Sequence, residues 1–175
     1  MDTLTLQHLM TLTLDVDFRS IQRIGAVPVG QRGVASVTGG RFEGARLNGT
    51  VLGGHDWFVG RPDGVMTIDV RLTMQTTDAA LIYLTYQGRF LAEPAVMARF
   101  AKGEMLEASE YSLAMIARFE CGHADYRWLN DVVAVGQGTQ TRTGPIYRIF
   151  QATRQPVDNQ LNADKLSPAD ARTKP

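Results

Sequence analysis

Two pairs of alternating charged residues are the best candidates for acid–base chemistry in this sequence. Asp69 and Arg71 stand two positions apart, and Arg118 and Glu120 repeat this spacing in the opposite order. Side chains two apart on a β-strand leave the same face, so each pair can share one ligand. A carboxylate can then act as a base and a guanidinium can hold an anion, without a metal. The spacing alone equally allows ordinary ion pairs on a solvent face.

Tyrosines supply the third group that such chemistry needs. Tyr83 and Tyr111 can each donate a phenolic proton to a ligand oxygen, or can pack as half-buried aromatic residues. We therefore expect a carboxylate of the two charged pairs to be the base, a guanidinium to neutralise developing charge, and Tyr83 to donate a proton.

Trp57 and His55 are further candidates for contact with a ligand. Trp57 can wall a pocket or belong to an ordinary core. His55 follows two glycines at an expected barrel mouth, where it can carry protons or be structural. The histidines are too scattered for a zinc site, so we expect no metal. The segment 136–138 lacks the lysine and helix of a phosphate loop, and no nucleophile elbow occurs, so we expect no cofactor.

These residues lie in segments with the two-residue period of β-strands. In 65–75, five apolar side chains alternate with threonine, aspartate, arginine and glutamine, and 10–17 alternates just as strictly. Helix is scarce, with one expected over 94–102 and a short turn over 124–130. About eight to ten short strands separated by tight turns, including Gly39-Gly40 and Gly53-Gly54, predict an all-β, closed antiparallel barrel.

Length and composition limit the remaining possibilities. The chain has 175 residues and equal numbers of acidic and basic side chains, 18 each, which disfavours nucleic acid as a partner. We expect one barrel domain over 1–153 and a polar, flexible tail over 154–175. Cys121 has no partner within the chain, and neither a signal peptide nor an apolar segment long enough for a membrane is evident. A cytoplasmic protein is the resulting expectation.

Several segments together resemble the uncharacterised bacterial family DUF3237. The resemblance extends over roughly residues 4–150, in the order and at the spacing of that family. The segments that carry it are Gly39 to Gly44, which includes Glu43, and then Leu47 to Leu52, Asp56-Trp57, Arg61 to Gly64, Ile68 to Leu72, Thr77 to Tyr83, Glu110-Tyr111, Arg118 to Glu120 and Tyr126 to Asn130.

The resemblance implies a barrel of lipocalin-like proportions, often paired into homodimers, with polar and aromatic residues at one end. It favours the inward orientation of the charged pairs and makes a small aromatic metabolite of catabolism the expected ligand. Arg118, Tyr111, Trp57, His55 and Glu43 are then the expected substrate-binding residues. The sequence departs from the family pattern at 112–115 and at Cys121, which implies a larger or more apolar ligand if that strand lines the pocket.

Three functions follow as hypotheses. The first is a cofactor-independent lyase or isomerase that moves protons on a small molecule. The second is a non-catalytic carrier of a hydrophobic metabolite, which needs the same cavity but no turnover. The third is a structural dimer in which the polar residues are merely solvated.

Overall fold

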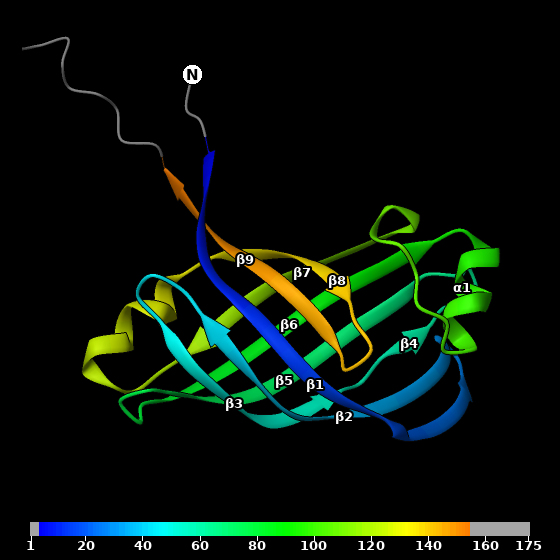
Figure 1. Ribbon diagram of the computed structural model, residues 1–175, viewed down its shortest axis with the longest axis horizontal. Helices are drawn as coiled ribbons and strands as arrows, with labels where there is room; N and C mark the ends of the chain where they lie inside the picture. Colours follow the sequence, from blue (N-terminus) through cyan, green and yellow to red (C-terminus); the bar gives the residue numbers. More distant parts are fainter. Residues whose placement is uncertain (1–3, 155–175) are drawn as a thin grey trace, which may run out of the picture.

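The computed structural model describes residues 4–154, which form one antiparallel sheet that closes on itself (Figure 1). The tail expected to be flexible lies, apart from its first residue, outside the described residues. The strands are β1 (Leu4–Val27), β2 (Gly30–Glu43), β3 (Asn48–Asp56), β4 (Val59–Gly60), β5 (Met66–Thr76), β6 (Leu81–Ala92), β7 (Tyr111–Glu120), β8 (Ala134–Gln140) and β9 (Pro145–Arg154).

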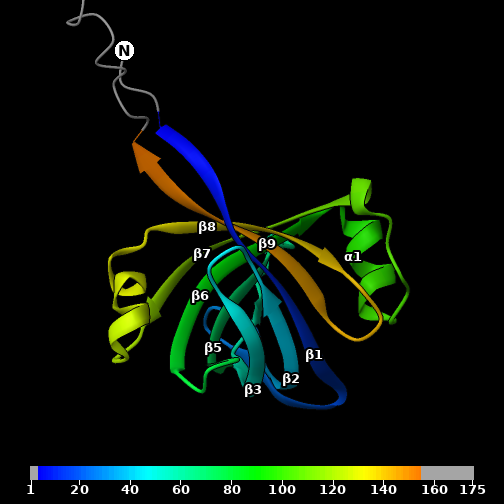
Figure 2. The same cartoon turned by 60° about the vertical axis from the view of Figure 1, so that its left-hand side comes forward.

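The ring closes because β1 pairs with both β2 and β9. Around the ring the order is β1, β9, β8, β7, β6, β5, β3 and β2, while the short β4 lies between β2 and β5 beyond the end of β3. Every pairing is antiparallel. The predicted closed antiparallel barrel is therefore confirmed, although its long, bulged strands give it an uneven outline (Figure 2).

Two helical segments lie at opposite ends of this ring (Figure 1). At one end is α1 (Pro94–Ala101), where Phe100 stacks on Phe90 with ring centroids 4.8 Å apart. At the other end is η2 (Ala124–Asp131), which buries Leu129 completely. A single 3-10 turn, η1 (Ala108–Glu110), leads into β7. No helix in the described part of the chain is long and apolar enough to cross a membrane.

The interior is an apolar core built by period-two alternation. In β5 the side chains of Ile68, Val70, Leu72 and Met74 are all buried, and β6 and β7 repeat the pattern. A strand that buries one face in this way has a fixed register, since a slip of one residue would expose its whole apolar set.

Two of the expected turns are wrong. Gly39-Gly40 lies within β2, and Gly53-Gly54 lies within β3. At Gly40, where φ is +142°, a Cβ atom would stand 2.1 Å from the carbonyl oxygen of Thr13 on β1. This glycine serves the close approach of two strands rather than a chain reversal.

Candidate functional site

The charged pairs expected inside the barrel lie on its outer face. Asp69 and Arg71 alternate with the buried apolar residues of β5, and their side chains are 36% and 45% exposed. Their carboxylate oxygen and guanidinium nitrogen are 3.5 Å apart. Arg118 and Glu120 likewise alternate with buried residues on β7. The expected inward orientation is wrong, because the apolar set of each strand can be buried on only one face.

One carboxyl group does face inward. Asp56 ends β3, and its Cα partners on the neighbouring strands are Ala35 of β2 and Val70 of β5, both buried. Directly opposed residues of antiparallel strands share a face, so Asp56 belongs to the interior set. Its Oδ1 accepts a hydrogen bond of 3.1 Å from the backbone N–H of Asp69. The second carboxylate oxygen has no hydrogen-bond partner within the described chain.

Burial dominates the ionisation of this group. It raises the pKa of Asp56 from 3.8 to about 7; the hydrogen bond from Asp69 opposes this rise and the negative charge of Asp69 adds to it. No cation contributes to the shift. A carboxyl group with such a pKa is present in both protonation states near neutral pH, as a general acid or base requires.

Two tyrosines share the interior with Asp56. The rings of Tyr86 and Tyr147 meet edge to face with centroids 5.3 Å apart, and both residues are buried. Burial is the main cause that raises the pKa of each phenol, and the charge of Asp56 raises both further. A side-chain hydrogen bond between the two tyrosines also raises the pKa of Tyr86 and lowers that of Tyr147, as expected when Tyr86 donates to Tyr147. Both hydroxyls stay protonated, and the proton of Tyr147 is left to donate to another group.

Small side chains surround this group of polar residues. Consecutive pairings place Ala35, Asp56, Val70 and Tyr86 in one interior row, which continues through two more alanines, Ala117 and Ala134. Next to Ala35 the ladder between β1 and β2 is interrupted, because its register jumps between the pairs of Asp17 and Gln22. Asp56 itself keeps part of its surface accessible. We call Asp56, Tyr86 and Tyr147 the interior site.

A model of the family described as protein of unknown function (DUF3237) matches residues 4–152. The chain belongs to the DUF3237 family. A UPF0311 protein of Rhodopseudomonas palustris is 24% identical over 139 residues, covering 79% of this chain and 91% of that protein. A UPF0311 protein of Clostridium acetobutylicum is 29% identical over 108 residues, covering 61% and 68%.

Solved structures share the fold of this DUF3237 chain. A beta-barrel like protein from Acinetobacter baumannii superposes with a TM-score of 0.75 at 29% identity, covering 86% of this chain and 97% of that one. The conserved protein of unknown function from R. palustris gives 0.81 at 23%, covering 86% and 99%. An enzyme from Penicillium herquei gives 0.63 at 21%, covering 87% and 95%. At these last two identities the likeness shows the fold alone.

Most of the site residues predicted for this DUF3237 member share one outer face. Ladder pairings give a row of His55, Arg71, Thr85 and Arg118, and a parallel row of Thr73, Tyr83 and Glu120. The ring of Trp57 lies 5.5 Å from that of His55, with the guanidinium carbon of Arg71 5.0 Å from the centre of the indole. The structure therefore brings these residues together, but outside the barrel.

Two predicted residues lie apart from this face. Glu43 pairs with Arg41 at 3.3 Å near the end of β2. Tyr111 stacks on Phe90 beside α1, and its hydroxyl accepts a 2.8 Å hydrogen bond from the backbone N–H of Gln140. Both contacts are structural links within the fold.

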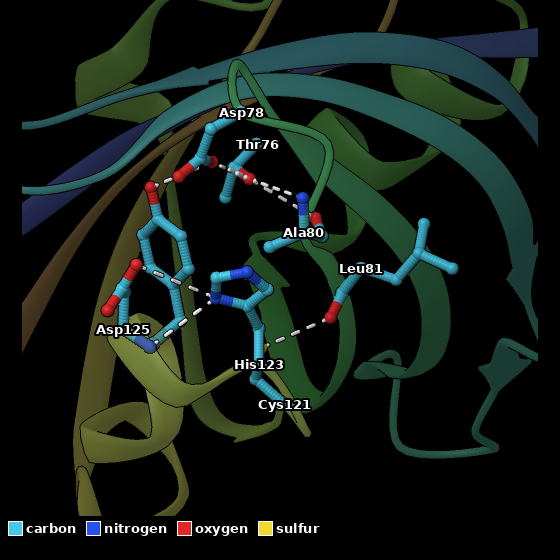
Figure 3. Close-up of polar contacts among 8 residues, drawn as sticks. Thr76, Asp78, Ala80, Leu81, Cys121, His123 and Asp125 are labelled. Atoms are coloured by element: carbon cyan, nitrogen blue, oxygen red, sulfur yellow. Dashed lines mark hydrogen bonds and ion pairs between the residues drawn. The ribbon is translucent and has the colours of Figure 1, made fainter.

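A pocket of about 480 Å³ opens on the outer face near η2, with Tyr83 and Glu120 in its wall. Behind them, the thiol of Cys121 donates to the carbonyl oxygen of Leu81 at 3.2 Å (Figure 3). The Asn130 amide also bonds the backbone of Cys121 in both directions, at 2.8 and 2.9 Å. The floor of the pocket is therefore fixed by structural hydrogen bonds.

Polar contacts beside this pocket fasten η2 to the barrel. Asp78 accepts hydrogen bonds from the hydroxyls of Thr76 and Tyr126, the latter at 3.0 Å. His123 accepts from the backbone N–H of Asp125 and lies close to its carboxylate (Figure 3). Within residues 4–154 no three histidine, cysteine or acidic side chains are grouped to hold a metal ion.

Sequence reasoning missed the interior site. Tyr86 and Tyr147 occupy interior positions of regular strands, where a tyrosine is indistinguishable from a packed aromatic residue. Asp56 did leave a signal, since Asp56-Trp57 is among the segments that carry the family resemblance. Gly53 and Gly54 have no side chains, so they interrupt the alternation of apolar and polar residues that would have predicted an inward position for Asp56.

Proposed function

We propose that this protein is a cofactor-independent lyase or isomerase that moves a proton on a small aromatic metabolite inside the barrel. The observation that carries the proposal is the inward carboxyl of Asp56, held in an apolar interior that also contains two protonated tyrosines. Buried groups with pKa values near neutrality are concentrated at functional sites.

The chemistry assigns a separate part to each group. Asp56 in its ionised form takes a proton from the substrate, and its protonated form returns one at another atom or to a leaving group. Tyr147 donates a hydrogen bond to the oxygen on which negative charge develops, and Tyr86 supports it by donating to the hydroxyl of Tyr147. The alanines Ala35, Ala117 and Ala134 share the interior row with Asp56 and Tyr86 and offer apolar surface for an aromatic ring.

The apolar character of the rest of the interior favours a carrier as the second candidate function. A carrier would use the same space and the same tyrosine hydroxyls to bind a hydrophobic metabolite. The two functions differ in one respect, because only the enzyme depends on the proton affinity of Asp56 for turnover.

Proton abstraction can be measured without the natural substrate. β-Tetralone, an uncharged aromatic ketone with acidic C–H groups, is incubated with the protein in D₂O, and loss of the α-proton signal is followed by NMR. We expect protein-dependent exchange that falls about 100-fold or more in Asp56→Asn, within the range for loss of a general base. Asp69→Asn is the matched control, because it makes the same change on the outer face and should retain exchange.

Each result separates the candidate functions. Equal exchange by the wild-type protein and folded Asp56→Asn would remove the catalytic assignment. Tight binding of β-tetralone without exchange would favour the carrier. Loss of exchange in folded Asp69→Asn would indicate that the catalytic site lies on the outer face instead.

A further inference from the structure

A second pocket opens on the outer face, beside the short strand β4. Its volume is about 580 Å³, within the range of about 300–1,000 Å³ that small-molecule sites occupy. Ladder pairings link Arg32 of β2 through Val59 of β4 to Thr67, whose side chain alternates with the buried residues of β5. The pocket therefore lies outside the barrel. Two arginines, one aspartate and three apolar residues stand in its wall: Arg32, Arg61, Asp63, Val29, Val59 and Pro62.

Arg32 is the half-buried cation of this pocket, which we call the Arg32 pocket. Its Nη1 donates to the carbonyl oxygen of Trp57 at 2.7 Å, and this bond fixes the direction of the guanidinium. No acidic side chain of residues 4–154 pairs with it. Its other nitrogens reach solvent, since no buried side-chain nitrogen of the described chain lacks a partner. Arg32 therefore offers free donors from a fixed position.

The acidic side chains around this pocket already have partners. Asp63 pairs with Arg61 in the pocket wall, and Asp69, further along the outer face of β5, pairs with Arg71 at 3.5 Å. Two cations and one anion leave the pocket one positive charge in excess. A planar guanidinium binds a carboxylate through two parallel hydrogen bonds, so a single carboxylate would supply the missing charge.

The remaining wall of the Arg32 pocket is apolar. Val29, in the turn that joins β1 to β2, is 56% exposed, although it lies beside the buried Val59 and near Pro62. A hydrocarbon group that covered Val29 would remove apolar surface from water, which favours binding. A small inorganic anion would leave this surface exposed.

We propose that the Arg32 pocket binds an organic monocarboxylate, with the carboxylate on Arg32 and an apolar body against Val29 and Pro62. One excess positive charge matches one negative charge, and the apolar wall matches the body of the ligand. The inference goes beyond the proposed function, because the pocket is separate from Asp56 and its occupation requires no reaction.

Three probes separate the charge of a ligand from its body. Cyclohexanecarboxylate has both, cyclohexanecarboxamide has the same body without the charge, and inorganic phosphate has charge without a body. Dissociation constants are measured by isothermal titration calorimetry at neutral pH. We expect the carboxylate to bind at least about tenfold more tightly than the amide, a difference of about 1.4 kcal/mol, and more tightly than phosphate.

Arg32→Gln removes the charge and should reduce binding of cyclohexanecarboxylate to the level of the amide. Arg89→Gln is the matched control and should leave binding within about twofold of the wild type. Arg89 stands opposite Thr67 and likewise donates to a backbone carbonyl, that of Gly88 at 3.0 Å, but it is not in the pocket wall.

A second pair of variants tests the same charge without altering Arg32. Val29→Glu places a carboxylate in the pocket wall and should weaken cyclohexanecarboxylate at least about tenfold, because it competes for the arginines. Val29→Gln has nearly the same shape without the charge and should weaken it much less. Both changes fall on an exposed turn residue, so the barrel core is untouched.

The inference is overturned if cyclohexanecarboxylate does not bind, if the amide or phosphate binds as tightly, or if Arg89→Gln weakens binding as much as Arg32→Gln. Equal affinities of Val29→Glu and Val29→Gln would overturn it as well. None of these results bears on β-tetralone exchange by Asp56, so the proposed function stands or falls separately.

Discussion

Asp56 has a structural role in the fold as well as the chemical role proposed for it. Its Oδ1 accepts the Asp69 N–H at the point where β3 ends, so it replaces part of the ladder between β3 and β5. An asparagine in this position would preserve the acceptor and remove only the ionisation. The substitution Asp56→Asn therefore separates the two roles better than alanine, which would also leave a buried N–H without a partner.

The raised pKa of Asp56 makes the stability of the protein depend on pH. The pKa is about 7 in the folded protein, against 3.8 for an aspartate side chain in water. Between these values the folded state binds the proton and the unfolded state does not, so stability falls as pH rises and levels off above about 7. The full effect is at most roughly 4 kcal/mol.

Urea denaturation of the wild type and Asp56→Asn at pH values from 4 to 8 measures this dependence. We expect the ionisation of Asp56 to lower the free energy of unfolding of the wild type as the pH rises. Asp56→Asn lacks this ionisation, so the difference between the two proteins should shift in favour of the variant. If the free energies of unfolding of the two proteins instead differ by the same amount at every pH, Asp56 has the same pKa in the folded protein as in the unfolded chain.

At the scale of single elements, glycines mark where strands and side chains pass closely. Gly49 lies in β3, and a Cβ atom there would stand 2.0 Å from the carbonyl oxygen of Gln75 and 2.7 Å from the ring of Phe42. The strand segments themselves were predictable from period-two alternation. The positions of Gly39-Gly40 and Gly53-Gly54 inside strands were not, because a glycine needed for a turn and one needed for close approach look alike in sequence.

Gly49→Ala should destabilise the barrel because backbone and a buried ring must both move. We expect a loss of about 1–3 kcal/mol in the free energy of unfolding, the usual cost of overpacking. Gly122→Ala is the matched control, since a Cβ atom there meets nothing within 4 Å. Thermal and urea denaturation of both variants test this. Equal stabilities would show that β3 and β5 are not so closely apposed at Gly49.

At the scale of the whole molecule, closure of the ring depends on β1. This strand pairs with β2 on one side and β9 on the other, so its inward side chains complete the core. Leu12 is fully buried, whereas the next residue, Thr13, is only half-buried.

Leu12→Ala should therefore cost about 2–5 kcal/mol through lost burial and a cavity in the core. Thr13→Ala should change the free energy of unfolding by no more than about 1 kcal/mol, because the shortened side chain lies on the other face of the same strand. Urea denaturation measures both. Similar losses in the two variants would contradict the inward and outward faces assigned to β1.

The sequence alone determined the strand content, the closed barrel, the family and the helix, which was predicted over 94–102 and found over Pro94–Ala101. These depend on local patterns: the alternation of apolar side chains, the proline that begins a helix, and motifs in a fixed order. Each pattern involves residues that are close together in the sequence, so it can be recognised without knowing which strands pair.

The direction of the polar faces was decided only by the tertiary structure. Alternation shows that Asp69 and Arg71 share the face opposite the apolar side chains, but not which face turns inward, because a barrel can also enclose a polar, ligand-holding interior. Closure buries the apolar sets of β5 and β7, which places the charged pairs outside. The same closure places Asp56 from β3 in one interior with Tyr86 and Tyr147 from β6 and β9, residues that no local pattern connects.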